Sequence, residues 1–309
     1  MSDKLRAYLY LHFCVFLWGF TAILGKLISL QALPLVWWRV LLCSLTLWFV
    51  LPGAELRRVP RAVFWQMLGV GAMVGLHWLC FYGAIKWSNA SVAVATMATT
   101  SFFSALSEPL VLRRKVNVYE LALGILILPG MALVAGNIDW NMRLGFAVGV
   151  LGALLAAVFT AWNKKIIDQG APPPLLMSFV ELSGGLAITS IALPFVLAVS
   201  PGLQVLPSNS DWLWLLLLAW VCTLLPYSLT LQSMRHISAF ATNLTINLEP
   251  VYGVILAGLI FREDKDLSPG FYIGVLIILA AVFSHPFIKM FVEKRRPKPG
   301  PDHVLDSDT

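Results

Sequence analysis

Ten apolar stretches follow one another along this chain, and each is about as long as a helix that crosses a lipid bilayer. A hydrocarbon core of about 30 Å needs about 20 residues at the α-helical rise of about 1.5 Å per residue. The connections between stretches are short, so we expect successive helices to be antiparallel neighbours. The predicted spans are residues 8–28, 34–51, 62–87, 90–112, 118–136, 144–164, 174–199, 212–232, 238–261 and 270–290.

The composition agrees with a chain that lies mostly in lipid. Hydrophobic residues make up 59% of the 309 residues and charged residues only 12%, whereas soluble domains carry about 25% charged residues. A transmembrane barrel would need strict alternation of apolar and polar residues, and continuous apolar runs such as 214–220 contradict it. The sequence therefore predicts an all-α polytopic membrane protein with ten transmembrane helices.

The four cysteines, Cys14, Cys43, Cys80 and Cys222, are isolated within apolar runs. They lack the paired spacing of a metal or redox site. We therefore predict that they pack as small apolar side chains, and we expect neither a metal nor a cofactor.

The formal net charge of +6 predicts the orientation in the membrane. Most of the 22 Lys and Arg residues fall at the ends that become cytoplasmic if both termini are cytoplasmic, as the positive-inside rule expects. We predict an integral protein of the bacterial inner (plasma) membrane, because the chain is compact and shows no targeting segment. Residues 293–309 are expected to form a disordered cytoplasmic tail. The basic residues are scattered over several loops, so no nucleic-acid partner is expected.

Short motifs repeat between the two halves of the chain. Phe20-Thr21-Ala22 recurs as Phe159-Thr160-Ala161, and the run at 124–128 recurs at 274–278. We divide the chain into an N-terminal repeat at 1–141 and a C-terminal repeat at 142–292. Each half has five spans, an odd number, so two copies must cross the bilayer in opposite senses. The fold class is therefore a five-plus-five inverted repeat, which in transporters places the substrate site between the halves.

At this point the sequence resembles the EamA-type branch of the drug/metabolite transporter (DMT) superfamily. The resemblance rests on the motif at 16–19 (Phe-Leu-Trp-Gly) and on the run at 247–253, which leads to Phe261-Arg262-Glu263. It covers residues from about 8 to 290. It implies a cavity lined by helices one, three, four, six, eight and nine, and export of small metabolites such as amino acids. The first half departs from the pattern, because Arg113-Arg114 stands where the second half has Arg262-Glu263.

Ionisable residues inside a span are candidates for function, because an unpaired charge in the bilayer costs several kcal/mol. His77 and Glu249 lie deepest and are the strongest pair, although packing or helix capping would also explain them. For Glu108 we favour pairing with Arg113 or Arg114 over a transport role. Glu181 is left unassigned.

Two polar stripes and a set of aromatic residues could line a cavity or serve helix packing. Helix four carries Thr96, Thr100, Ser104 and Glu108 on one face. On helix nine one face carries Asn243 and Asn247 and the opposite face Thr242, Thr245 and Glu249. We expect that both faces cannot see the same cavity, and the sequence does not say which one does. Lys26 and Arg39 are read as side chains that snorkel toward the headgroups. Aromatic side chains could hold a flat or cationic substrate. They are Trp18, Trp78, Tyr82, Trp162 and Tyr227.

The resulting hypothesis is a secondary transporter, and an exporter by the resemblance, that moves a small polar metabolite such as an amino acid by alternating access. No Walker A, H-E-x-x-H or G-x-S-x-G motif indicates an enzyme. An importer of a cationic or quaternary amine and a non-transporting scaffold remain alternatives. Proton coupling through Glu249, His77 or Glu108 and a homodimer stay open. The predicted substrate-binding residues are Trp18, His77, Trp78, Tyr82, Thr100, Trp162, Tyr227, Asn243, Asn247 and Glu249.

Overall fold

The structure is a computed structural model that describes residues 2–51, 53–262 and 267–295, and in this part of the chain every regular element is helical. Nine helical segments there are long and apolar enough to cross a bilayer, and α15 (Pro269–Arg295) contains a tenth, shorter apolar stretch at Pro269–Ala281. The chain is thus an all-α polytopic membrane protein. Residues 296–309 of the predicted tail, and the acidic residues after Arg262, lie outside the described residues.

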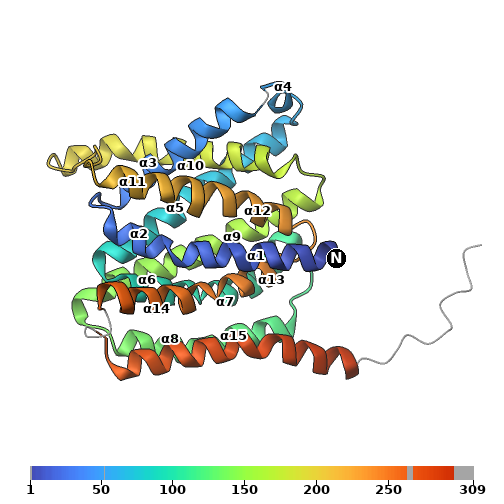
Figure 1. Cartoon of the computed structure of the whole chain (residues 1–309). Helices are drawn as coiled ribbons and strands as arrows, with labels where there is room; N and C mark the ends of the chain where they lie inside the picture. The colour runs from blue at the N-terminus through green and yellow to red at the C-terminus, as the bar shows by residue number, and fades with distance from the viewer. Residues whose placement is uncertain (1, 52, 263–266, 296–309) are drawn as a thin grey trace, which may run out of the picture.

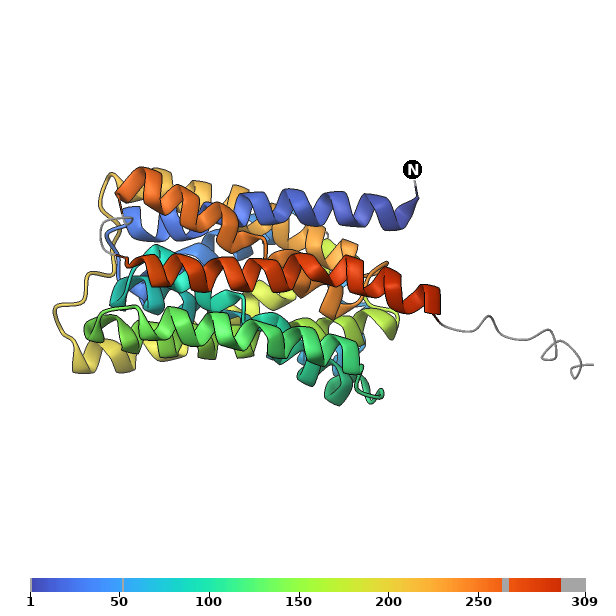
Figure 2. The ribbon, with the colours of Figure 1, turned by 90° about the horizontal axis from the view of Figure 1, so that it is seen from below.

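The helices run side by side, and the N-terminus lies at the same end of the bundle as the C-terminal end of α15 (Figure 1). The unbroken spans are α3 (Ala32–Val50), α5 (Arg61–Trp87), α8 (Val118–Gly136), α9 (Arg143–Asp168) and α10 (Pro174–Val199). The short α4 (Gly53–Leu56) precedes α5, and a 3₁₀ turn η1 (Trp140–Met142) precedes α9. The pair α8 and α15 forms one edge of the bundle (Figures 1 and 2).

Three other spans are each broken into a longer and a shorter helix. The first consists of α1 (Asp3–Gly19) and α2 (Thr21–Leu27), the fourth of α6 (Ala90–Met97) and α7 (Thr100–Leu112), and the ninth of α13 (Ala239–Ile246) and α14 (Glu249–Phe261). The breaks leave backbone groups that side chains satisfy in part. Thr21 Oγ1 donates to Trp18 O at 2.7 Å, and Thr99 Oγ1 donates to Thr96 O at 2.7 Å.

The eighth span changes its helix type instead of breaking. It runs through α11 (Asp211–Leu216), the π-helical segment η2 (Leu217–Leu224) and α12 (Leu225–Ser233). Pro226, at the start of α12, has no N–H to donate to the preceding turn, which favours such an irregularity. The hydroxyl of Thr223 donates to Leu218 O, so it compensates for the altered backbone bonding.

The fourth and ninth spans share one pattern. Each begins at a side-chain N-cap, Asn89 or Ser238, continues as a helix of 8 residues, breaks, and continues as a helix of 13 residues. Each ends at an arginine in the left-handed conformation, Arg113 at φ 52° and Arg262 at φ 57°. The two spans run in opposite directions (Figure 1). The shared pattern supports the predicted duplication, and the opposite directions are those that an inverted repeat requires.

The predicted halves interlock through close helix contacts. Helix α5 of the first half packs between α9 and α10 of the second, and α1 packs against α12. Glycines bring α5 and α10 together: a Cβ on Gly71 would lie 1.8 Å from the carbonyl oxygen of Glu181, and one on Gly184 would lie 2.2 Å from that of Leu68. The small-residue motif at Gly71 therefore sets a helix contact. The four cysteines are free thiols, and Cys14, Cys43 and Cys222 are buried.

Candidate functional site

A cavity of about 100 Å³ lies where the three broken spans meet. Residues from both sides of each break line it: Trp18 and Thr21, Met97 and Thr100, Ile246 and Glu249. The walls come from helices one, three, four, six, eight and nine, the set that the resemblance implies, and Arg39 of α3 is added to them. The other lining residues are His77, Trp78, Phe81, Ala156, Phe159, Thr160, Asn163, Tyr227, Thr230, Leu231, Met234 and Asn243.

Arg39 is the cation of this cavity. Its side chain is only 2% exposed, Nε donates to Thr223 Oγ1 at 2.6 Å, and Nη1 donates to Tyr82 Oη at 2.9 Å. The guanidinium lies 3.8 Å from the centre of the Trp78 ring, where a cation is attracted to the ring face. Nη2 has no hydrogen-bond partner among the described residues.

The interpretation of Arg39 as a snorkelling side chain is therefore wrong. Arg39 lies seven residues after Ala32, the first residue of α3, or about 10 Å along the helix. At that depth the nearest polar partners are the hydroxyls of Thr223 and Tyr82 rather than headgroups. The number of residues between the start of the span and Arg39 is the sequence signal that could have identified it as a deeply placed side chain.

Glu249 is the acidic residue of the same cavity. It is the first residue of α14, is 7% exposed, and has no hydrogen-bond or ion-pair partner within the described part of the chain. Arg39 also lines the cavity, but it forms no salt bridge with Glu249 among the described residues. The site thus holds a guanidinium and a carboxyl group that line one cavity without a direct ion pair between them.

His77 lies in the cavity wall between two aromatic rings. Its Nδ1 is 2.8 Å from Gly152 O, and because a carbonyl only accepts, Nδ1 carries the proton. The ring stacks on Phe81 and meets Phe159 edge to face. One hydrogen bond and two ring contacts therefore fix the side chain of His77 in the cavity wall.

The structure brings seven of the ten predicted substrate-binding residues together and places three elsewhere. Tyr82 is fully buried behind the wall, where it holds Arg39. Trp162 is 36% exposed, and its Nε1 donates to Gln66 on α5 at 3.5 Å. Asn247 is buried at the helix break, where its amide donates to Ala98 O and to Ser101 Oγ. The seven lining residues are Trp18, His77, Trp78, Thr100, Tyr227, Asn243 and Glu249.

The expectation that the cavity sees only one face of the ninth span is also wrong. It assumed a straight helix, on which Asn243 and Glu249 point in roughly opposite directions. The break between Ile246 and Glu249 changes the direction of the side chains, and both residues line the cavity. One residue of each stripe therefore lines the cavity.

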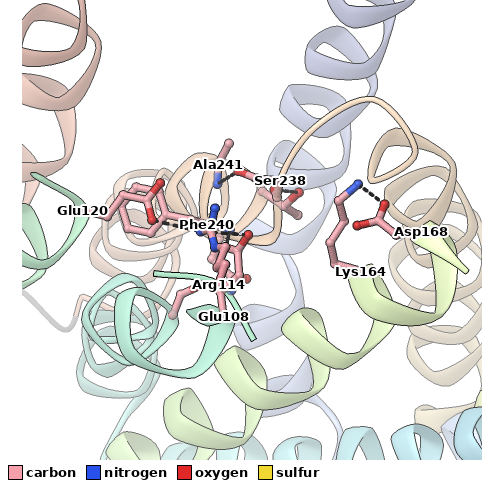
Figure 3. A network of polar contacts seen from close by, with 11 residues as sticks. Glu108, Arg114, Glu120, Lys164, Asp168, Ser238, Phe240 and Ala241 are labelled. Atoms are coloured by element: carbon pink, nitrogen blue, oxygen red, sulfur yellow. Dashed lines mark hydrogen bonds and ion pairs between the residues drawn. The ribbon is translucent and has the colours of Figure 1, made fainter. Parts of the chain in front are cut away.

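A polar cluster joins the halves (Figure 3) at the end of the bundle where α1 and α13 begin (Figure 1). Glu108 on α7 accepts a hydrogen bond from the backbone N–H of Phe240, in the first turn of α13, and its Oε1 lies 3.0 Å from Arg114 Nη2. A carboxylate at a helix N-terminus is favourable because free N–H groups and the helix dipole both point at it. Glu108 thus caps a helix of the other half and pairs with Arg114, as the sequence favoured.

Removal of this cap is expected to lower stability measurably. We expect Glu108→Ala to cost about 1–2 kcal/mol, because it removes the acceptor of the Phe240 N–H and one of the two carboxylates that pair with Arg114, the other being that of Glu120. The neighbouring Ser107 is the control, since its buried hydroxyl has no partner in the described structure and Ser107→Ala should be neutral. Thermal unfolding of the purified variants measures both, and equal melting temperatures would refute the capping role.

At the opposite end of the bundle Asp211 binds the loop that follows α2. Its carboxylate accepts from the backbone N–H and the hydroxyl of Ser29 at 2.7 and 2.6 Å, and from the N–H and hydroxyl of Ser208 at 2.9 and 2.7 Å. Lys86 Nζ adds a bond to Ile28 O at 2.7 Å. Polar contacts between the halves therefore lie at both ends, with the cavity between them.

Fold and cavity together describe a polytopic membrane protein with a polar chamber between its halves. The model of the EamA-like transporter family matches the chain twice, over residues 5–136 and 143–285. The chain belongs to that family, and the two matches fall within the two predicted repeats.

Known relatives of the chain agree with this class. The chain is 21% identical over 260 residues to the uncharacterized transporter YxxF of Bacillus subtilis (strain 168), covering 82% of this chain and 81% of the relative. It is 21% identical over 216 residues to the uncharacterized transporter YetK of the same organism, covering 68% and 64%. A solved crystal structure, titled only as that of a protein, superposes with a TM-score of 0.65 at 15% identity, over 93% of this chain and 99% of the other. That last likeness shows the fold alone.

Proposed function

We propose that this transporter carries a small zwitterion of the amino-acid type. The observation that carries the proposal is the presence of Arg39 and Glu249 in one cavity, without a direct ion pair between them. A free α-carboxylate fits the open Nη2 of Arg39, and an α-ammonium fits the carboxylate of Glu249. Hydrogen bonds to charged groups contribute about 1.5–3 kcal/mol each, enough to select a solute that bears both charges.

The rest of the cavity favours a small solute with an apolar side chain. Trp18, Trp78, Phe81 and Phe159 supply aromatic walls, and Asn243 supplies an amide whose Nδ2 donates to Ser104 Oγ at 3.1 Å. The volume of about 100 Å³ is below the roughly 300–1,000 Å³ of pockets for drug-sized ligands. Arg39 opposes the entry of a quaternary amine, because it adds a like charge to the cavity.

The cycle proposed is alternating access, with export from the cytoplasm of a bacterium across its inner membrane. The polar contacts of Glu108 and of Asp211 would open in turn, so that the cavity communicates with one side at a time. Both termini are placed in the cytoplasm. The N-terminus and the C-terminal end of α15 lie at the same end of the bundle, and the positive-inside rule favours the cytoplasm for that end.

Transport by purified protein in liposomes tests the proposal. Vesicles preloaded with unlabelled leucine should accumulate external labelled leucine by exchange, and protein-free vesicles should not. Unlabelled amino acids should compete, whereas choline should not. Exchange of labelled choline without exchange of any member of an amino-acid panel would replace the proposal by transport of a quaternary amine, and the absence of all exchange across that panel would reject it.

A further inference from the structure

Glu181 is a buried carboxyl group directly behind the cavity wall. It lies on α10, is 0% exposed and does not line the cavity. Its Oε2 accepts from the hydroxyl of Tyr227 and from Nδ2 of Asn163, the latter at 3.2 Å. Both donors do line the cavity. Any rearrangement of Tyr227 or Asn163 around a solute therefore changes the hydrogen bonds of Glu181.

Two buried oxygens in this group lack a hydrogen-bond partner. They are Oε1 of Glu181 and Oδ1 of Asn163, and no donor for either lies in the described part of the chain. A buried acceptor without a donor costs about 1–3 kcal/mol, so an arrangement that leaves two of them in adjoining residues is unfavourable. Turning the amide over gives no relief, because its oxygen would then face Oε2 of Glu181.

A single proton removes both defects. On Oε1 it turns that oxygen into a donor, which can bond to Oδ1 of Asn163 while Nδ2 of the same amide donates to Oε2. This is the two-bond pairing of a carboxylic acid with an amide. A metal cation would need more oxygen ligands than these two.

The surroundings of Glu181 supply no countercharge for an ionised carboxylate. Helices α3, α5 and α12 pack against α10, and among the described residues Glu181 has no salt bridge. Tyr227, the one titratable side chain of the described residues that bonds to it, is an uncharged donor. Arg39 of α3, His77 of α5 and Lys164 of α9 are bonded to other partners. In a low-dielectric interior the neutral acid is then the favoured form.

We propose that Glu181 is a proton-binding site of this transporter, with its proton held on Oε1 against Oδ1 of Asn163. The proton is exchanged with water in the cavity, and the cavity residues Tyr227 and Asn163 link its binding to occupation of the site. The coupling role rests on the proposed transport function. The proton site itself does not, so the two can be tested apart.

Infrared spectroscopy of the lipid-reconstituted protein tests the site without any substrate. The wild type should show the C=O stretching band of a protonated carboxyl group that disappears on titration to alkaline pH. Glu181→Gln should remove that band, and Thr189→Val on the same helix should keep it, because the Thr189 hydroxyl bonds only to carbonyls of its own helix. Tyr227→Phe removes a donor to Oε2 and should shift the band to higher frequency. An unchanged titrating band in Glu181→Gln, or an unshifted band in Tyr227→Phe, would overturn the proposal.

Transport under a pH gradient tests the coupling. Leucine flux in wild-type and Thr189→Val vesicles should respond to an imposed pH gradient. Glu181→Gln, which imitates the protonated acid, should keep exchange but lose at least tenfold of the gradient-driven component. A full response in Glu181→Gln, or a response of the wild type to sodium in place of protons, would contradict the coupling. If no amino acid is carried, the proposed function fails, while the infrared band still decides on the proton site.

Discussion

Substitution of Glu249 by glutamine is expected to weaken amino-acid binding roughly 10- to 100-fold while the protein stays folded. Glutamine has the same shape and keeps an acceptor, so the change removes only the charge that would hold the ammonium group. A charged hydrogen bond contributes about 1.5–3 kcal/mol, and each 1.4 kcal/mol is tenfold in affinity. The concentration of leucine that half-saturates exchange measures the effect.

Arg39→Met should weaken amino-acid binding by a similar factor, because it removes the guanidinium that would hold the carboxylate of the solute. The substitution also leaves the hydroxyls of Thr223 and Tyr82 without their donor, so a lower melting temperature is expected as well. Arg39→Lys keeps the charge but loses the fork of donors, and should fall between the wild type and Arg39→Met.

Trp162→Phe is the matched control for these changes. Trp162 lies outside the cavity, and its indole N–H donates to Gln66. The Trp162→Phe variant should therefore exchange leucine with wild-type kinetics. Wild-type affinity in Glu249→Gln, or an equal loss in Trp162→Phe, would mean that the solute does not bind where the two charges lie.

The second large effect is expected at Gly71 on α5. A methyl group there would lie 1.8 Å from the carbonyl oxygen of Glu181, a backbone atom that no rotamer change can move. Gly71→Ala should therefore force α5 and α10 apart, with a loss of stability at or above the upper end of the about 1–3 kcal/mol that overpacking costs. Lower yield and a lower melting temperature of the detergent-solubilised protein measure it.

Gly69, on the same helix, provides the control. It is exposed, and a Cβ at that position meets nothing within 4 Å. Gly69→Ala should leave yield and melting temperature unchanged. Equal stability of the two variants would mean that the close contact of α5 with α10 is absent from the folded protein.

Much of the fold could be predicted from hydropathy, since the length of each apolar run fixes a span and short connections fix antiparallel neighbours. The helix breaks could not. The break between Met97 and Thr100 contains neither glycine nor proline, so no local signal marks it. It depends on tertiary contacts, such as the bond from Asn247 to Ala98 O, that no sequence window contains.

The same dependence on tertiary contacts explains which residues of the cavity lining could be predicted. Glu249, His77 and Trp18 could be predicted because polar or aromatic side chains at mid-depth are costly or distinctive in lipid. The role of Asn163 could not, because it depends on α9 and α10 bringing it to Glu181. The placement of Trp162 was wrong for a related reason: the side of α9 that faces the cavity is decided by its neighbours and not by its own residues.

Competition by three matched compounds tests the central claim, that Arg39 and Glu249 together receive the opposite charges of one solute. Leucine, 3-methylbutylamine and 4-methylpentanoate share one side chain and bear both charges, only the ammonium, or only the carboxylate. In exchange assays with labelled leucine, we predict that leucine competes at least tenfold more strongly than either of the others. Equal competition by the amine or by the acid would contradict the account.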